Sequence, residues 1–363
     1  MNPVVDDVGE LTTEWLTAAL ATSGVDAAVT AVTAERIGTG QIGVCYRLSL
    51  TYGAGDGDAG REPGRATLVA KLAAGDAAAR ERVKDGFAKE VGFYTRLADT
   101  VDVPIPHCWY GAISGDKKSF VLLLDDLAPA RAGVQADGCT PAQAAACVLS
   151  LAGLHAPRWN DEALLAVDFL TPMDAGTATF LGEVFAAATD EFVARYDAEL
   201  TAADASTLCD VAAAITPWFL ARPTPFAVVH GDYRPDNLMF EPTGDGPGDG
   251  AVVLDWQTVS VGPPLRDLAY FLGTSLAPGD RRAHEHDLVR TYHEALAARG
   301  VSGYDLEACF EDYRLGQLHG PFITVLGCLY ATAERSERSD GMFLAMATRS
   351  CAAIRDLRSL ELL

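Results

Sequence analysis

Three polar residues in the second half of the chain have types and spacing that could transfer a phosphoryl group. The segment HGDYRPDN, which starts at His230, has the spacing H-x-D-x-x-x-x-N. Phosphoryl transfer needs a carboxylate that accepts the proton of the attacking hydroxyl and an oxygen ligand for magnesium, both on one rigid loop. Asp232 fits the first role and Asn237 the second. Asp255, at the end of the segment AVVLD, adds a carboxylate that would bridge magnesium to the β- and γ-phosphates.

Three glycines in the first half of the chain could cover those phosphates. Gly38, Gly40 and Gly43 form the string G-x-G-x-x-G, which dinucleotide-binding folds also use where the string opens a helix. Here the following residues, VCYRLSLTY, continue as a strand. A glycine loop between two strands is typical of the phosphate-covering loop of kinases. The alternative is a glycine-rich hairpin that binds no ligand.

A lysine and a glutamate complete the predicted phosphate site. Lys71 lies in the apolar strand ATLVAKLA, and Glu90 lies in the helix that follows. A buried lysine needs a partner, and a Lys–Glu pair that also contacts the α- and β-phosphates satisfies that need. A lone, solvated lysine at a strand end is the alternative. The order of glycine loop, lysine strand and acidic helix favours phosphoryl transfer.

The elements that must position these residues form a β-rich part followed by a mostly helical part. In the first part, periodicity predicts a helix over 11–22, a hairpin over 29–52, a strand over 66–73, a helix over 81–98 and strands near 108–113 and 117–127. In the second part, it predicts a capped helix over 140–155, a hairpin over 226–259 that turns at 241–250, and helices over 281–299, 305–335 and 340–360.

The change of character near residue 127 predicts two lobes in an α+β fold. A chain of 363 residues, 49% of them hydrophobic, is long enough for two cores. We expect residues 1–127 to form a nucleotide-binding lobe and residues 128–363 a catalytic and substrate-binding lobe.

Charge, apolar runs and cysteine spacing limit the kinds of partner, the cellular location and the metal or disulfide sites that we expect. The net charge of −22 disfavours nucleic acids and anionic lipid surfaces. No uninterrupted apolar run approaches the roughly 18 residues of a membrane span, and the acidic start of the chain is unlike a secretory signal, so we expect a soluble cytoplasmic protein. The eight cysteines form no C-x-x-C pair. Several of them, such as Cys147 and Cys209, are predicted to be small buried hydrophobes.

The segment HGDYRPDNLMF, with LDWQTVSVGPPLRDLAYFL after it, resembles the aminoglycoside phosphotransferase and choline-kinase-like superfamily. Within it, the sequence is most similar to the ecdysteroid-kinase-like branch of phosphotransferase enzymes. The resemblance covers most of the chain from about Ile37 onward and is most specific at the catalytic hairpin. It implies a protein-kinase-like bilobal fold, with ATP and Mg²⁺ as cofactors and the hydroxyl of a small molecule as phosphate acceptor.

The resemblance also assigns roles to individual residues. It implies that Asp232 is the catalytic base, that Asn237 and Asp255 bind magnesium, and that Lys71 and Glu90 bind phosphate. The backbone of Leu124, Asp125 and Asp126 would then meet the adenine between the lobes. Asp267 resembles the family's buried aspartate that braces the catalytic loop, and His230 is interpreted as structural.

Two other functions stay open at this point. One is a nucleotide-binding pseudokinase without turnover, although every expected catalytic group is present. The other is a protein kinase. Trp256 and Gln257 follow Asp255 where protein kinases have Phe-Gly, and no A-P-E segment follows, so the sequence argues against a peptide substrate. The acceptor, the choice between ATP and GTP, and the oligomeric state are not predicted.

Overall fold

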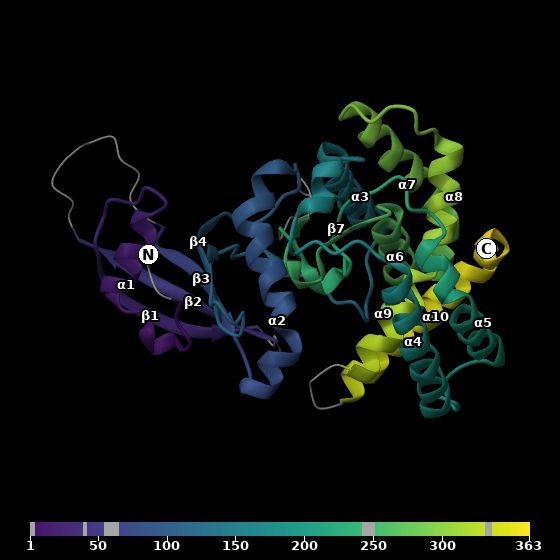
Figure 1. Cartoon of the computed structure of the whole chain (residues 1–363), viewed down its shortest axis with the longest axis horizontal. Helices are drawn as coiled ribbons and strands as arrows, with labels where there is room; N and C mark the ends of the chain where they lie inside the picture. Colours follow the sequence, from purple (N-terminus) through teal and green to yellow (C-terminus); the bar gives the residue numbers. More distant parts are fainter. Residues whose placement is uncertain (1–3, 39–41, 54–64, 242–250, 331–335) are drawn as a thin grey trace. The chain divides into compact units, whose positions relative to one another are not determined.

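The structure is a computed structural model that describes residues 4–38, 42–53, 65–241, 251–330 and 336–363. The chain divides into two compact units, which we describe separately (Figure 1). Unit 1 contains residues 1–99, 105–128 and 255–258. Unit 2 contains residues 100–104, 129–254 and 259–363.

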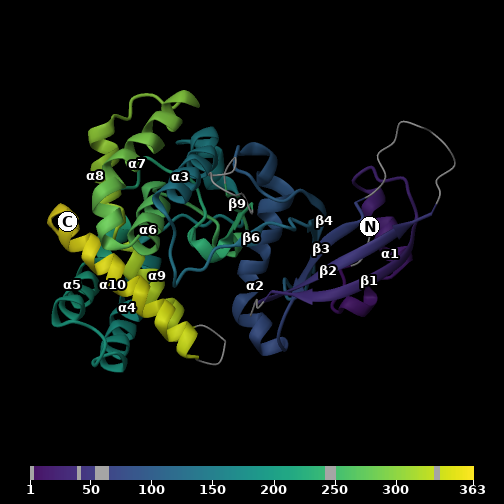
Figure 2. The same ribbon diagram turned by 180° about the vertical axis from the view of Figure 1, so that it is seen from behind.

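Unit 1 is built on a five-stranded antiparallel sheet with the strand order β1-β2-β3-β5-β4. The strands are β1 (Val29–Ile37), β2 (Gly43–Tyr52), β3 (Thr67–Ala73), β4 (Cys108–Ile113) and β5 (Phe120–Asp125). Figure 2 shows β1, β2 and β3 side by side. The predicted hairpin and all three further predicted strands are therefore present.

Two helices of unit 1 pack against opposite faces of the sheet. Helix α1 (Thr13–Ala21) shares a hydrophobic core with Ala70 and Leu72 of β3. Successive strand residues point to opposite faces, so Lys71, between those two residues, faces the other side. There it meets helix α2 (Ala77–Gly92), whose first turn is capped by the side chain of Asp76. This cap makes the helix begin earlier than the predicted residue 81, and a π-helical turn (Phe93–Leu97) continues it.

Unit 2 is mostly helical. Its helices are α3 (Pro141–His155), α4 (Ala175–Arg195), α5 (Ala202–Leu220), α6 (Leu265–Ser275), α7 (Pro278–Ala298), α8 (Leu306–Gly316), α9 (His319–Tyr330) and α10 (Glu337–Leu357). Buried side chains of α4, α5, α9 and α10 form one hydrophobic core. The predicted capping box at the start of α3, between Thr140 and Gln143, is present. The α+β organisation predicted from the sequence is therefore confirmed.

Two details of the predicted helical part differ from the structure. The predicted hairpin is confirmed in part, because β8 (Leu238–Phe240) pairs antiparallel with β9 (Val252–Val253) on either side of the predicted turn. The island as a whole forms two small sheets, however, since β8 also pairs with β6 (Arg131–Ala132), whereas β7 (Ala227–Val229) pairs with β10 (Ser260–Gly262). The single helix predicted over 305–335 is two helices, α8 and α9. They separate near Gly316, where an added Cβ would lie 2.7 Å from the carbonyl oxygen of Leu265, so the close approach of α6 requires a glycine.

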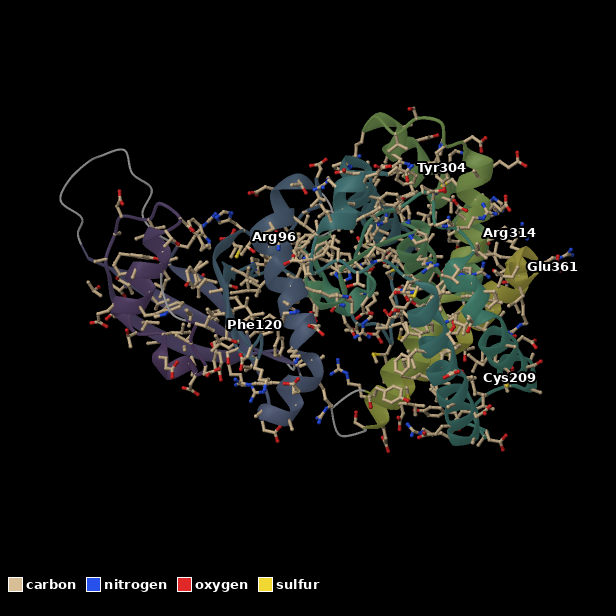
Figure 3. All side chains as sticks on the ribbon, in the orientation of Figure 1. Arg96, Phe120, Cys209, Tyr304, Arg314 and Glu361 are labelled. Carbon is tan, nitrogen blue, oxygen red and sulfur yellow. The ribbon has the colours of Figure 1, made fainter. Side chains whose placement is uncertain are left out.

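The cysteine prediction was right for one named residue and wrong for the other. Cys147 is fully buried in α3. Cys209 in α5, labelled in Figure 3, is exposed. Leu208 and Val211 occupy the buried stripe of α5, so Cys209 falls on the outer face of the helix. Within the described ranges, no helix is long and apolar enough to cross a membrane.

Candidate active site

Unit 1 contains a cluster of three charged residues and one amide around Lys71, which we call the Lys71 cluster: Lys71, Glu90, Asp255 and Gln257. The ammonium of Lys71 lies 2.6 Å from Glu90 Oε1 and 3.3 Å from Asp255 Oδ1. Gln257 Nε2 donates to the other carboxylate oxygen of Glu90 at 3.1 Å. Lys71 and Glu90 are buried, whereas the side chain of Asp255 is 44% exposed. The predicted pairing of Lys71 with Glu90 is therefore present.

In the Lys71 cluster, burial and the attraction between opposite charges act in opposite directions. Burial alone would lower the pKa of Lys71, but the carboxylates of Asp255 and Glu90 raise it above its ordinary value. Burial raises the pKa of Glu90, against the opposing effect of Lys71. Because Lys71 carries the positive charge for two carboxylates, loss of the lysine would leave a buried acid without compensation.

The segment after Asp255 fixes this cluster to α2. Trp256 stacks on Phe93 with 3.5 Å between the ring centroids and 8° between the ring planes. Asp255 itself has a φ of 63°, in the left-handed region that is sparsely populated by residues other than glycine. Such conformations persist where surrounding contacts determine them. Stacking by Trp256 and hydrogen bonding by Gln257 supply such contacts.

Two of the three predicted loop glycines can be placed. Gly38 has a φ of 69°, a conformation that favours glycine. Gly43 is the first residue of β2, and a Cβ there would lie 2.8 Å from Cε of Lys71. Gly43 thus makes room for the lysine side chain. Gly40 lies outside the described residues.

Of the three residues predicted to meet adenine, Leu124 and Asp125 end β5 and Asp126 follows it. The N–H of Asp125 donates to the carbonyl of His107 at 3.0 Å, so this donor is already used within unit 1. Asp126 accepts two bonds from Arg47, at 2.7 and 3.1 Å. Burial opposes ionisation of Asp126, but these bonds lower the pKa of its carboxyl. A backbone contact of Leu124 or Asp126 with adenine stays a prediction.

Unit 2 contains a second cluster, which we call the Asp232 cluster: Asp232, Arg234, Asn237 and Tyr270. The Tyr270 hydroxyl donates to Asp232 Oδ1 at 2.8 Å. Asn237 Nδ2 and Arg234 Nε lie 3.1 and 3.2 Å from Asp232 Oδ2. Burial would lower the pKa of Arg234, but the neighbouring Asp232 raises it, so the guanidinium stays charged. Three donors therefore hold one carboxylate.

Two residues hold the backbone of the loop that carries Asp232. Asp267 is fully buried in α6 and accepts hydrogen bonds from the N–H groups of His230 and Gly231, at 2.6 and 2.9 Å. Burial would raise its pKa, but hydrogen bonding and the nearby His155 lower it. His319 Nε2 donates to the carbonyl of Gly231 at 3.0 Å. The predicted bracing contact of Asp267 with the loop is present.

His230 has the geometry of a neutral structural histidine. The N–H of Asp232 donates to its Nδ1 at 3.2 Å. The ring proton must then lie on Nε2, which donates to the carbonyl of Leu254 at 2.9 Å. The ring thus ties the Asp232 loop to the strand that leads to Asp255, as the sequence interpretation expected.

The side-chain oxygens of Asn237 and Asp255 are of the type that binds magnesium. Within the described ranges, no group of three or more His, Cys, Asp and Glu side chains could hold a metal ion. Magnesium, however, is commonly held by one or two protein oxygens together with water and phosphate. Asn237 uses its Nδ2 to bind Asp232, which leaves Oδ1 as its acceptor, and the Asp255 carboxylate is partly exposed. Asn237 lies in unit 2 and Asp255 in unit 1, so their pairing around one ion stays a prediction.

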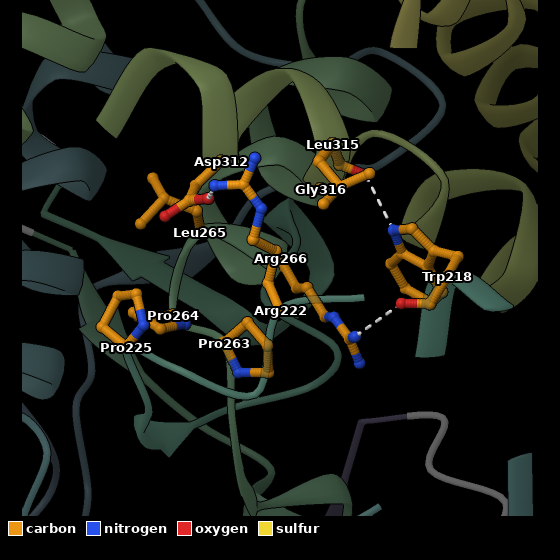
Figure 4. A pocket seen from close by; sticks show the side chains of 10 residues that line it. All are labelled: Trp218, Arg222, Pro225, Pro263, Pro264, Leu265, Arg266, Asp312, Leu315 and Gly316. Atoms are coloured by element: carbon orange, nitrogen blue, oxygen red, sulfur yellow. Dashed lines mark hydrogen bonds and ion pairs between the residues drawn. The ribbon is translucent and has the colours of Figure 1, made fainter. Parts of the chain in front are cut away.

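A pocket in unit 2 lies outside both clusters. Figure 4 shows Arg266 against Trp218, and the guanidinium carbon is 4.0 Å from the ring centroid. Burial lowers the pKa of Arg266 to about 10. The space left between the lining residues is about 20 Å³, close to the volume that one water molecule needs. The pocket is too small for a nucleotide or an acceptor alcohol.

Four contact residues were missed by the sequence analysis: Arg234, Gln257, Tyr270 and His319. A signal existed for Tyr270, because it follows the predicted bracing residue Asp267 by one helical turn and therefore shares its face. No spacing rule connects Gln257 with Glu90, or His319 with Gly231, since these contacts join distant parts of the sequence.

Comparison with solved structures shows the fold. Choline kinase from Cryptosporidium parvum has a TM-score of 0.54 and 8% identity, with 92% of this chain and 91% of that chain covered. Ethanolamine kinase from Plasmodium vivax has a TM-score of 0.52 and 11% identity, with 91% and 84% covered. The GDP complex of aminoglycoside 2'-phosphotransferase-IIIa has a TM-score of 0.52 and 16% identity, with 93% and 98% covered. The expected bilobal kinase-like fold is therefore confirmed.

Sequence comparison identifies the family. Over 44 residues the chain is 48% identical to acyl-CoA dehydrogenase family member 11 from Gallus gallus, a match that spans 12% of this chain and 5% of that protein. The model of the ecdysteroid kinase-like family matches residues 38–300, which is more than half of the chain and includes both clusters. The chain therefore belongs to the ecdysteroid kinase-like family, the branch that the sequence resembles.

Proposed function

We propose that this protein transfers the γ-phosphate of ATP to a hydroxyl group of a small molecule, with magnesium. The observation that carries the proposal is the Lys71 cluster, in which one buried ammonium pairs with Glu90 and Asp255. A Lys–Glu pair of this kind, next to a magnesium-binding aspartate, is the arrangement that kinases use for the triphosphate. Membership of the family and the Asp232 cluster support the same function.

In the proposed reaction, unit 1 holds the donor. Lys71 contacts the α- and β-phosphates, and its ammonium is held by Glu90, whose carboxylate is in turn held by Gln257. Asn237 and Asp255 would hold magnesium, which neutralises charge on the phosphates when bound. Positioning and neutralisation of charge supply most of the rate in phosphoryl transfer.

Asp232 acts on the acceptor. It orients the alcohol and accepts the hydroxyl proton as the alcohol oxygen forms a bond to the γ-phosphorus. The bond between that phosphorus and the β–γ bridging oxygen breaks, and its electron pair leaves with ADP. The products are a phosphate ester, ADP and a protonated Asp232, which returns its proton to solvent.

The proposal is tested by ADP release from purified protein with magnesium and ATP. The acceptor panel covers aminoglycosides, choline, amino-alcohols, sugars, macrolides and steroids, with GTP as an alternative donor. At least one alcohol should accelerate ADP release, and Asp232→Asn should lower that rate by roughly 10² to 10⁴. Asp210→Asn, an exposed aspartate in α5, is the matched control and should leave the rate unchanged.

Two results would contradict the proposal. Tight binding of Mg-ATP with no acceptor-dependent ADP release across the panel would favour a pseudokinase. Transfer to a peptide library but to no small alcohol would favour a protein kinase.

A further inference from the structure

The hydrogen bonds at Asp232 distinguish its two carboxylate oxygens. A carboxylate offers about four lone-pair positions, two on each oxygen. Asn237 and Arg234 both donate to Oδ2, whereas Tyr270 alone donates to Oδ1. Within the described part of the chain, Oδ2 is therefore saturated and Oδ1 keeps one acceptor position. The side chain of Asp232 is 23% exposed, so it is partly open to solvent.

Tyr270 is placed to keep that oxygen in one orientation. It lies in α6, where every residue from Leu268 to Ser275 is buried, and its ring packs edge-on against His319 with 5.4 Å between the centroids. Burial, reinforced by the negative charge of Asp232, raises the pKa of its hydroxyl well above the ordinary value. The hydroxyl therefore stays a donor. Since Tyr270 is fully buried, it acts through Asp232 and does not contact the acceptor itself.

We propose that Asp232 Oδ1 is the atom that receives the proton of the acceptor alcohol, and that Tyr270 is the positioning residue that presents it. This inference rests on the proposed function. Asn237 and Arg234 hold Oδ2 and Tyr270 holds Oδ1, so both oxygens of the carboxylate are fixed. Without the Tyr270 hydroxyl the carboxylate keeps its Oδ2 bonds, but Oδ1 is no longer directed to one position.

Tyr313 offers a matched control for this role. It is also a fully buried tyrosine, and its hydroxyl donates to a carboxylate oxygen of Glu285 at 3.0 Å. Tyr270→Phe and Tyr313→Phe each remove one buried hydroxyl that binds a carboxylate. The two variants should therefore lose similar stability, while only the first alters Asp232.

The experiment measures turnover of both variants with Mg-ATP and the best alcohol from the panel. A hydrogen bond to a charged group contributes about 1.5 to 3 kcal/mol, so Tyr270→Phe should lower kcat by roughly 10- to 100-fold. Its KM for Mg-ATP should stay that of the wild type, and its melting temperature should match that of Tyr313→Phe. Tyr313→Phe should keep the kcat of the wild type.

Three outcomes would overturn the inference. In the first, Tyr270→Phe has the same kcat as the wild type. In the second, both tyrosine variants lose the same activity, which would indicate a general loss of stability. In the third, a crystal structure with bound alcohol places its hydroxyl on Oδ2. Full activity of Asp232→Asn would instead overturn the proposed function, whereas an inactive Asp232→Asn beside a fully active Tyr270→Phe would overturn only this inference.

Discussion

The two clusters hold their carboxylates by opposite arrangements. In the Lys71 cluster, one cation forms ion pairs with two carboxylates, those of Glu90 and Asp255. In the Asp232 cluster, three side chains donate hydrogen bonds to one carboxylate. Loss of the single cation leaves a buried negative charge unpaired, whereas loss of one donor leaves two others in place. Substitutions in the Lys71 cluster should therefore affect stability and nucleotide affinity, and those of Asp232 and its donor Tyr270 mainly turnover.

The strongest test of this comparison is Lys71→Met. Removing one member of a buried ion pair commonly costs about 3 to 5 kcal/mol, so we expect a loss of that order in the free energy of unfolding and weak binding of Mg-ATP. The double variant Lys71→Met with Glu90→Gln removes both charges and should recover part of the stability, although not the nucleotide affinity. Urea unfolding and calorimetric titration measure the two quantities. A double variant that is less stable than Lys71→Met would contradict the account.

A smaller effect is expected from Gly43→Ala. The added methyl group would lie 2.8 Å from Cε of Lys71 and must displace it. This atom is near the end of a flexible side chain, so stability should change little, whereas the KM for Mg-ATP should rise with kcat little changed. Gly115→Ala in the same unit is the control, because no atom lies within 4 Å of its added Cβ. Equal KM values for the two variants would show that Gly43 does not make room for Lys71.

The smallest effect is expected from His319→Gln, and it should depend on pH. Burial lowers the pKa of His319 from its ordinary value of 6.5. As the pH falls through that value, His319 becomes protonated in the unfolded chain but stays neutral in the folded protein. The histidine therefore lowers the free energy of unfolding in acid. Glutamine keeps a donor for Gly231 but does not titrate.

The free energy of unfolding of the wild type should thus decrease more than that of His319→Gln between about pH 7.5 and about pH 5.5. Thermal or urea unfolding at both pH values measures this difference. Identical changes in the two proteins would mean that His319 is not held neutral by the fold.

Local signals in the sequence predicted much of this molecule, and contacts between distant segments account for the rest. The Lys71–Glu90 pair was predictable because alternation placed Lys71 on one face of β3 and periodicity placed Glu90 on the facing side of the next helix. The separation of α8 from α9 was missed because a helical period continues through Gly316. The exposure of Cys209 was missed because an apolar pattern shows that a helix has a buried face but does not give its exact rotation.

At the candidate active site, residue types and spacing indicated which side chains would gather, but not the hydrogen bonds around them. The H-x-D-x-x-x-x-N spacing identified Asp232 and Asn237, and both lie within one hydrogen-bonded cluster. The contacts of Gln257 with Glu90 and of Tyr270 with Asp232 depend on how separate elements pack. Only the shared helical face of Asp267 and Tyr270 could have indicated the second of these contacts.

The most direct test of the central claim follows the γ-phosphate itself. The protein is incubated with magnesium, the panel alcohols and ATP whose γ-phosphate carries heavy oxygen, and mass spectrometry then detects the phosphorylated products. The account predicts a labelled phosphate ester of at least one small alcohol with the wild type, and a roughly 10² to 10⁴ slower appearance of that ester with Asp232→Asn. Tight binding of Mg-ATP by both proteins, with no labelled ester from either, would contradict it.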